Sequence, residues 1–320
     1  MKEYTRVIGV DIGGTKIAVS LADNEGNLLA SARIPSAKYE ENLADIVRAA
    51  QEMLRAHHLS PADIACCGIS APGPLDMENG RFLSTPNMDW QDAPIRDDLA
   101  NALGVRAVLE NDANAGVLAE HYFGLAKGKT DAVYLTLSTG IGAGVISGGK
   151  LITGKKGIGT EMGHVVLDVN GPQCNCGLRG CLEAYCGGRA MASRIQEMLR
   201  EKPDHPMLRM PGVDGKLENL TYQTVRDAAK AGISPAVELW DENCMRLAQG
   251  LGFVLATFNP EIVILGTCAY YAGDFLMKPV LEKLPQFTWP EFLDCCEICA
   301  TKLGPKVGEL AGVSVALYNL

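Results

Sequence analysis

The sequence predicts an α/β protein built from two related halves, and three observations lead to this prediction. The chain has 320 residues, which is enough for two domains. Short apolar runs bounded by glycine alternate with longer stretches in which apolar residues recur at helical spacing. One order of strands and glycine turns occurs twice, at residues 6–34 and again at 131–153. We therefore expect a duplicated unit and two halves with related folds that face each other.

The first copy of the repeat is a meander of antiparallel strands. The predicted strands cover residues 7–10, 17–21 and 28–34. The turn between the first two contains Gly13 and Gly14, and it also carries Asp11, Thr15 and Lys16. Paired glycines, a hydroxyl and a lysine are the parts of a phosphate cradle. A strand follows this turn, so it is not a phosphate loop of the G-x-x-x-x-G-K-[ST] type, which opens a helix.

The remaining elements are predicted from the spacing of apolar residues and from the positions of glycine and proline, which end helices and strands. Helices are expected at residues 41–57, 97–103, 189–201, 222–231, 236–258 and 308–318, with Thr221 as the N-cap of the fourth. Further strands are expected at residues 64–70, 107–109 and 261–265, with Cys66 and Cys67 in a strand core. The C-C-E-I-C group at 295–299 resembles a second metal site, but its apolar neighbours favour a buried strand.

Asp112 lies where a predicted strand gives way to a helix. The strand 107–109 stops at Glu110-Asn111-Asp112, and the run A-N-A-G-V-L begins the helix. Open α/β sheets place their ligands at such connections. A carboxylate there can act as a general base toward a substrate hydroxyl. It can equally be a favourable contact with the helix dipole, and both interpretations stay open at this point.

The second copy of the repeat carries the run S-T-G-I-G-A-G at 138–144. This run contains G-x-G-x-G, but a dinucleotide-binding fingerprint requires a helix directly after it, whereas a strand and a turn follow here. Either glycine turn alone could be a plain hairpin. Two such glycine turns occur in matching units, each with threonine beside glycine. This pattern favours a pair of loops that bind one polyphosphate.

A cluster of thiols follows the second copy. Cys174, Cys176 and Cys181 lie within eight positions, and His164 lies ten residues before the first of them. Three thiols and an imidazole form the Cys₃His ligand set of a closed structural zinc site. The alternative is a group of ordinary buried cysteines.

Side chains suited to a polyol surround these features. Sugars are held by carboxylate and amide edges, and the candidates are Asn87, Asn111, Glu161 and Glu183. The last two flank the thiol cluster without being needed as ligands.

The composition excludes several classes of protein. A net charge of −9, with no basic cluster longer than Lys155-Lys156, argues against nucleic-acid binding. The first residues carry charge and lead directly into a strand, and no run of about 18 apolar residues could span a membrane. Eleven cysteines without an export signal suggest reduced thiols in the cytoplasm.

Taken together, the motifs resemble those of the ROK family of sugar kinases, a branch of the actin-like ATPase superfamily that includes bacterial glucokinases. The matching runs are D-I-G-G-T-K at 11–16, A-P-G-P-L-D at 71–76, P-N-M-D-W at 86–90, E-N-D-A-N-A at 110–115, S-T-G-I-G-A-G at 138–144, E-M-G-H at 161–164 and G-P-Q-C-N-C-G-L-R-G-C-L-E-A-Y at 171–185. The resemblance covers essentially the whole chain. One departure is that Thr267-Cys268 follow Gly266, where the family usually has further glycines beside the adenine.

The resemblance implies an actin-like ATPase (ribonuclease H-like) fold with two α/β domains and a cleft between them. Residues 1–118 plus 305–320 are expected to form a smaller N-terminal domain, and 119–304 a larger C-terminal domain with the zinc loop. The hinge between the halves is expected near residues 112–130.

The resemblance also assigns roles to the candidate residues. Asp112 becomes the catalytic base. The sugar-binding set is Asn87, Asn111, Asp112, Glu161, His164 and Glu183. The ATP-binding set is Asp11, Gly13, Gly14, Thr15, Lys16, Thr139, Gly140, Gly142 and Gly266, with Asp11 near Mg²⁺. The structural Zn²⁺ is held by His164, Cys174, Cys176 and Cys181, and His164 faces the sugar with its other ring nitrogen.

The activity implied is ATP-dependent phosphorylation of a hexose at its 6-hydroxyl, as in the glucokinase step of glycolysis. Kinases of N-acetylmannosamine, N-acetylglucosamine, fructose or allose are the alternatives, since they share these residues. A sugar-responsive regulator without a DNA-binding domain is a further alternative, although Asp11 lies too near the start for a helix-turn-helix domain to precede it. A catalytically silent sugar-binding module is disfavoured by Asp112 and the two loops. The partners are the sugar and ATP, with no nucleic acid or membrane, and a homodimer is possible.

Overall fold

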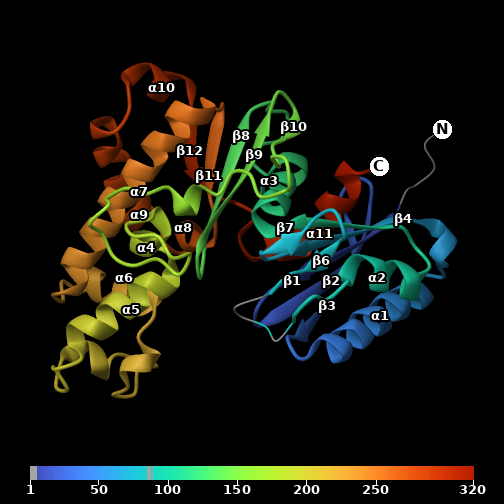
Figure 1. Cartoon of the computed structure of the whole chain (residues 1–320), viewed down its shortest axis with the longest axis horizontal. Coiled ribbons are helices and arrows are strands. Elements are labelled where there is room, and N and C mark those ends of the chain that lie inside the picture. Colours follow the sequence, from blue (N-terminus) through green and yellow to red (C-terminus); the bar gives the residue numbers. More distant parts are fainter. Residues whose placement is uncertain (1–5, 85–87, 89) are drawn as a thin grey trace. The chain divides into compact units, whose positions relative to one another are not determined.

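The computed structural model describes residues 6–84, 88 and 90–320 (Figure 1). Contacts divide the chain into two compact units. The first unit comprises Met1–Lys129, Gly144–Thr160 and Lys302–Leu320, and the second comprises Thr130–Ala143 and Glu161–Thr301. Among the described residues, no helix is both long enough and apolar enough to cross a bilayer.

The first unit is organised on a mixed five-stranded sheet of order β3-β2-β1-β4-β7. Its strands are β1 (Arg6–Ile12), β2 (Lys16–Asp23), β3 (Leu28–Pro35), β4 (Ile64–Ala71) and β7 (Ala107–Asn111). The first three pair antiparallel, as predicted, while β4 and β7 run parallel to β1. A short hairpin, β5 (Leu75–Asp76) with β6 (Arg81–Phe82), follows β4. Both Cys66 and Cys67 are fully buried in β4, as expected for strand core.

Helices cover both faces of this sheet because alternate side chains of each strand point to opposite faces. On one face, α1 (Tyr39–Ala56) and α2 (Ile95–Leu103) pack over a core that contains Ile8 and Ile69. On the other, α11 (Val307–Tyr318) packs over Val7 and Cys66, beside α3 (Asp112–Phe123) (Figure 1). The helix α11 lies so close to the strands that a Cβ on Gly68 would stand 2.1 Å from the carbonyl oxygen of Gly312.

The second sheet has the order β10-β9-β8-β11-β12. Its strands are β8 (Ala132–Leu137), β9 (Ile141–Ser147), β10 (Lys150–Leu151), β11 (Ile262–Leu265) and β12 (Glu297–Ala300). Numbered in chain order, its strands are arranged 3-2-1-4-5, and so are those of the first sheet. This match confirms the predicted duplication. That the two halves face each other stays a prediction.

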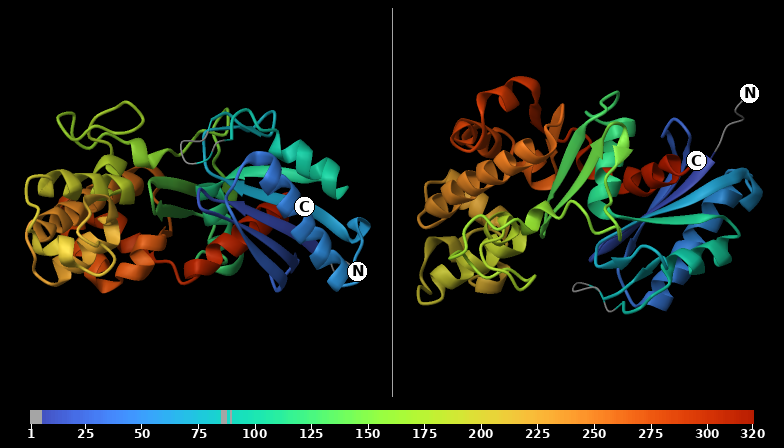
Figure 2. Two further views of the ribbon diagram at one scale, coloured as in Figure 1. Left: turned by 90° about the horizontal axis from the view of Figure 1, so that it is seen from below. Right: turned by 45° about the horizontal axis from the view of Figure 1, so that its top comes forward.

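Helices make up the remainder of the second unit. They are α4 (Leu182–Cys186), α5 (Gly188–Leu199), α6 (Tyr222–Lys230), α7 (Ala236–Phe258), α8 (Thr267–Ala272), α9 (Asp274–Lys283) and α10 (Pro290–Cys295). The long helix α7 is central, since it contacts α4, α5, α6 and α9. Both views of Figure 2 show α5, α6, α7 and α9 (yellow to orange) gathered in one bundle. The predicted cap is present, because the Thr221 hydroxyl accepts a hydrogen bond from the Thr224 amide.

Two predicted elements are wrong in detail. The buried strand expected at 295–299 begins only at Glu297, and Cys295 is the exposed last residue of α10. The reason is that β12 is the outer strand of its sheet, so it is only partly covered. The third strand of the second repeat is also much shorter than that of the first, since β10 has only two residues.

The contacts also shift the expected domain boundaries. A boundary at residue 118 would fall inside α3, and because α3 packs against α11, the whole helix belongs to the first unit. The segment Gly144–Thr160, expected in the C-terminal part, is also grouped with the first unit. That the two units act as hinged domains stays a prediction.

Candidate active site and metal centre

Beside the turn between β1 and β2 lies a partly buried acid. Asp11 is the penultimate residue of β1, and its Oδ1 accepts a hydrogen bond of 2.7 Å from the Ser70 hydroxyl on β4. Burial raises the pKa of Asp11 to about 7, and the nearby charge of Asp112 adds to the rise, while the Ser70 hydrogen bond and Lys16 oppose it. The two acids, about one hundred residues apart in the sequence, are therefore neighbours at one end of the sheet.

The glycine turn beside Asp11 is open. The Gly13 amide closes the hairpin by donating to the Lys16 carbonyl at 3.0 Å. Beyond it, Gly14, Thr15 and Lys16 are exposed. The predicted phosphate-binding residues of this turn are thus accessible to a ligand.

The connection from β7 to α3 holds Asp112 in place. The Asn111 side chain caps α3 by accepting a hydrogen bond of 2.9 Å from the Ala113 amide. Before it, Glu110 accepts hydrogen bonds of 2.9 Å from the Asn111 amide and from Asn114, and burial raises the pKa of Glu110. Asp112 is the first residue of α3 and is exposed. A cap and a partly buried acid therefore hold the start of α3, where the exposed Asp112 lies.

The corresponding turn of the second unit, between β8 and β9, is braced by other elements. The Ser138 and Thr139 carbonyls accept hydrogen bonds from the first amides of α5, at 2.8 and 3.0 Å. The Ile141 amide donates to Glu183 Oε2 at 2.9 Å, and a Cβ on Gly140 would lie 2.4 Å from the same oxygen. A side chain at position 140 would therefore displace the Glu183 carboxylate from its hydrogen bond with the Ile141 amide. The predicted loop residue Gly142 donates its amide to Thr136 Oγ1 at 2.8 Å.

A cavity of about 700 Å³ opens beside this turn, within the second unit. Its lining residues are Ser138, Thr139, Gly188, Arg189, Ala192, Thr221, Tyr222, Gln223, Arg226, Cys268 and Tyr271. Cys268, which departs from the family pattern, is part of this wall. Gly266, predicted to contact the nucleotide, is the N-cap of α8, and a Cβ there would stand 2.6 Å from the Tyr134 hydroxyl oxygen; its contact with a nucleotide stays a prediction.

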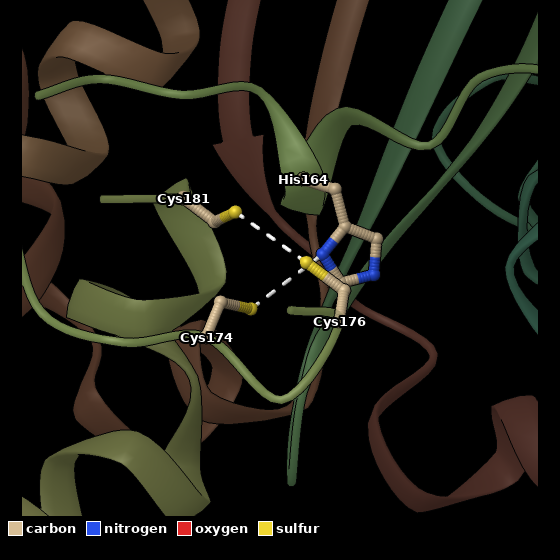
Figure 3. A group of neighbouring side chains, drawn as sticks. All are labelled: His164, Cys174, Cys176 and Cys181. Carbon is tan, nitrogen blue, oxygen red and sulfur yellow. Dashed lines mark hydrogen bonds between the residues drawn. The ribbon is translucent and has the colours of Figure 1, made fainter. Parts of the chain in front are cut away.

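The structure brings the predicted metal ligands together (Figure 3). One ligand atom from each of His164, Cys174, Cys176 and Cys181 lies within 4.8 Å of all the others. The Cys174 sulfur is 3.7 Å from His164 Nδ1, and the Cys176 and Cys181 sulfurs are 3.7 Å apart. A tetrahedron with Zn–S bonds of about 2.3 Å has edges of about 3.8 Å. The four side chains therefore fit a closed zinc site.

Tight local turns shape this loop. The Gly177 amide donates to the Cys174 carbonyl, and the Cys174 amide donates to the Leu178 carbonyl. Gly177 has φ +94°, a conformation that residues with a Cβ rarely adopt. The glycine-rich spacing between the thiols is thus what allows them to converge.

Two predicted sugar-binding acids lie beside the thiol cluster. The Cys174 sulfur is 3.9 Å from Glu183 Oε1. Burial raises the pKa of Glu161, the nearby charge of Glu183 adds to the rise, and His164 opposes it. Glu161, His164 and Glu183 are therefore mutual neighbours in the second unit. Asn111 and Asp112 belong to the first unit, so contact of all five with one sugar stays a prediction. Asn87 lies outside the described residues.

Sequence reasoning missed several residues that support these sites. Ser70 binds Asp11, Glu110 fixes the start of α3, and Thr136 closes the second turn. The partners of Ser70 and Thr136 lie on another strand or several residues away, so no motif marked these two, while Glu110 lies in the run E-N-D-A-N-A but was given no role. Ser70 had one usable signal, because it is a polar residue at the end of an otherwise apolar strand.

Comparison with known proteins places these features in one family. The ROK family model matches residues 7–316. The chain is 39% identical to a glucokinase of Thermotoga maritima over 314 residues, covering 97% of this chain and 96% of the relative. It is also 28% identical to a xylose repressor of Bacillus spizizenii, covering 98% of this chain but 77% of the repressor.

Solved structures agree with this result. A ROK hexokinase from Thermus thermophilus superposes with a TM-score of 0.83 at 32% identity, covering 98% of this chain and 99% of that one. A ROK glucokinase from Streptomyces griseus, solved with glucose and AMPPNP, gives a TM-score of 0.78 at 30% identity, covering 97% and 99%. The predicted α/β fold with two sheets of actin-like ATPase type is thereby confirmed.

Proposed function

Because the chain belongs to the ROK family, we propose that it is an ATP-dependent sugar kinase that phosphorylates glucose at its 6-hydroxyl. The observation that carries this proposal is the pairing of Asp11 with Asp112 beside an open glycine turn, since one acid can serve the metal and the other the sugar. The glucokinase relatives support glucose as the acceptor.

Asp112 is the catalytic base in this proposal. Its carboxylate takes the proton of the 6-hydroxyl, the sugar oxygen forms a bond to the γ-phosphorus, and the bond from that phosphorus to the bridging oxygen breaks to release ADP. The exposed turn at residues 13–16 and the braced turn at 138–140 hold the phosphates. Mg²⁺ supplies charge neutralisation on the phosphate oxygens, and Asp11 is the acid that would hold it. The cavity beside Thr139, walled by Tyr222 and Tyr271, takes the nucleoside.

The thiol cluster is proposed as a structural zinc site. His164, Cys174, Cys176 and Cys181 would hold the ion, and four protein ligands leave no open position for water. The imidazole uses Nδ1 toward the thiols, which leaves its other nitrogen for the sugar (Figure 3). Glu161 and Glu183 complete this sugar-binding wall, with Asn111, Asp112 and Asn87 as its expected counterparts. Zinc removal should then weaken sugar binding rather than stop the chemical step.

A test is to mix the purified protein with Mg-ATP and a panel of hexoses and to follow ADP release. Glucose should be the best substrate, ahead of N-acetylmannosamine, N-acetylglucosamine, fructose and allose. Asp112→Asn is the control variant. Phosphorylation of none of these sugars, or an Asp112→Asn variant as fast as wild type, would refute the proposed mechanism.

The repressor relatives make a sugar-binding regulator the second candidate. It predicts glucose or xylose binding without ADP release. Within the kinase proposal, we place the protein in the cytoplasm, in glycolysis and as a possible homodimer.

A further inference from the structure

One arginine of α7 contacts both segments that carry the sugar-binding wall. Arg246 Nη2 lies 3.3 Å from Asp168 Oδ2, and Nη1 lies 3.0 Å from Gln249 Oε1. The guanidinium carbon lies 4.4 Å from the centre of the Tyr185 ring. The side chain is only 23% exposed, so these contacts are partly shielded from water.

The contacts of Arg246 lie within and beside the metal loop, which is the segment 164–181 that carries the four proposed zinc ligands. Asp168 lies in the segment between His164 and the first thiol, and its carbonyl accepts a hydrogen bond from the Gly171 amide. One turn along α7 from Arg246, Gln249 donates to the Leu167 carbonyl at 3.2 Å. One face of α7 therefore holds residues 167 and 168.

The same arginine also reaches the helix that carries a sugar-binding acid. Tyr185 lies on α4, two residues after Glu183, and the guanidinium covers its ring. The Tyr185 hydroxyl in turn donates to Asp168 at 3.4 Å. Arg246, Asp168 and Tyr185 thus form a closed set of contacts. Arginine suits this place because its planar group can stack on a ring and make an ion pair at once.

We propose that Arg246 is a positioning residue for the sugar-binding wall. It acts through Asp168 on the segment that follows His164 and through Tyr185 on the helix turn that carries Glu183. Loss of Arg246 leaves both segments less constrained, so the carboxylate and imidazole that meet the sugar are held less accurately. This inference rests on the proposed function, because it assigns Glu183 and His164 to the sugar.

A nearby arginine provides a matched control. Arg194 on α5 also approaches the Tyr185 ring, at 5.5 Å, and forms an ion pair with Glu242. Within the described chain, the recorded contacts of its guanidinium include neither Leu167 nor Asp168. Arg194→Ala therefore removes a guanidinium from the same ring without removing a recorded direct contact to residues 167 and 168, although Glu242 also pairs with Arg246 at 4.0 Å.

The kinetic test compares Arg246→Ala, Arg246→Lys and Arg194→Ala. Removing residues that orient first-contact groups typically costs about 10- to 100-fold. Arg246→Ala should raise the KM for glucose by about that factor and leave the KM for ATP within about twofold. Arg246→Lys, which keeps the charge but not the planar group, should restore part of the loss, and Arg194→Ala should change neither KM by more than about twofold. Equal effects of the two alanine variants, or a parallel rise in both KM values, would overturn the proposal.

Hydrogen exchange provides a readout that needs no activity. In the protein without substrates, Arg246→Ala should speed exchange of the Leu167 and Gly171 amides, whereas Arg194→Ala should not. If the wild type phosphorylates no hexose, the proposed function fails and the exchange rates still decide whether Arg246 holds the loop. If the kinase is active and exchange at these amides is unchanged, only the positioning role fails.

Discussion

The two glycine turns occupy the same place in two sheets of the same strand order, yet they differ in chemistry. The penultimate residue of the strand before the turn is Asp11 in the first unit and Thr136 in the second. Asp11 is a partly buried acid that receives a hydroxyl hydrogen bond from another strand, whereas the Thr136 hydroxyl accepts from Gly142 within its own hairpin. The first copy of the repeat thus has an acidic side chain beside its turn. The second has a neutral hydroxyl at the same place, and this hydroxyl closes the turn by a hydrogen bond.

The turns also differ in how they are supported. Residues 14–16 of the first are exposed, whereas the second is held by the N-terminus of α5 and by Glu183. The difference suggests a division of labour, in which the first unit supplies the acids for the reaction and the second supplies a rigid wall. Variants on each side can test this division.

The largest effect is expected for Asp112→Asn. Without the base, kcat should fall by about 10²- to 10⁴-fold while the KM for ATP changes little. The measurement is steady-state kinetics with glucose and Mg-ATP. A matched control is Asp97→Asn, which removes an acid from the first turn of α2 in the same unit. If both variants lost only stability, the helix-dipole interpretation of Asp112 would be the correct one.

A smaller effect is expected when the first turn is made like the second. Asp11→Asn removes the charge but keeps an acceptor for Ser70, and kcat should fall by about 10- to 100-fold with a higher Mg²⁺ concentration at half-maximal rate. Thr136→Val, its counterpart in the second unit, should change the Mg²⁺ dependence little. Titration of both variants with Mg²⁺ at fixed ATP measures the difference. If the rate depended on Mg²⁺ concentration in the same way for Asp11→Asn and wild type, the proposed division of labour would be contradicted.

Disruption of the metal loop should act on sugar binding alone. Cys181→Ser, or chelation of the wild type, should lower the zinc content measured by atomic spectrometry from one ion per chain and raise the KM for glucose about tenfold. The KM for ATP should stay nearly constant, because neither of the turns proposed to bind phosphate contains a zinc ligand. Cys186→Ser is a suitable control, since Cys186 is buried on α4 and is not a member of the ligand group. Zinc loss with an unchanged KM for glucose would contradict the proposed role.

The smallest effect concerns stability and pH. The pKa of Asp11 rises from 3.8 to about 7 in the folded protein, mainly because the carboxyl is buried. Between these two values the folded state retains a proton that the unfolded chain has lost, so this group makes the protein less stable as pH rises. Asp11→Asn lacks this decline, and its Tm relative to wild type should increase from pH 5 to pH 7.5 by about 2–4 °C. Thermal unfolding without Mg²⁺ at both pH values measures it, and a Tm difference independent of pH would contradict the raised pKa.

Several features of the two units could be predicted from the sequence, because the residues that indicate each feature lie close together in the chain. The repeat at 6–34 and 131–153 predicted two sheets of related order, and the spacing of three cysteines after His164 predicted a converging ligand set. Burial of β12 was not predictable in the same way, since an outer strand and an inner strand can share one apolar pattern.

Contacts between distant segments were the part that the sequence could not supply. The raised pKa of Asp11 depends on burial that only the fold creates. Arg246 likewise lies on a long helix with the pattern of core packing, and its contacts with Asp168 and Tyr185 join segments more than sixty residues apart. Residue types and spacing identify groups that act on a ligand more readily than groups that hold other side chains in place.

The helix α11 has a consequence for how the protein is made. It covers one face of the first sheet, including Val7 and Cys66, but it is made after every strand of that sheet. At about 5–20 residues per second, synthesis from the end of α3 to the end of α11 takes about 10–40 s. During that interval the apolar face of β1 and β4 lacks α11, while both segments of the second unit, Thr130–Ala143 and Glu161–Thr301, are being made. We therefore expect the first sheet to finish folding only after the segments of the second unit have been made, with its exposed strands the point at which chaperones act.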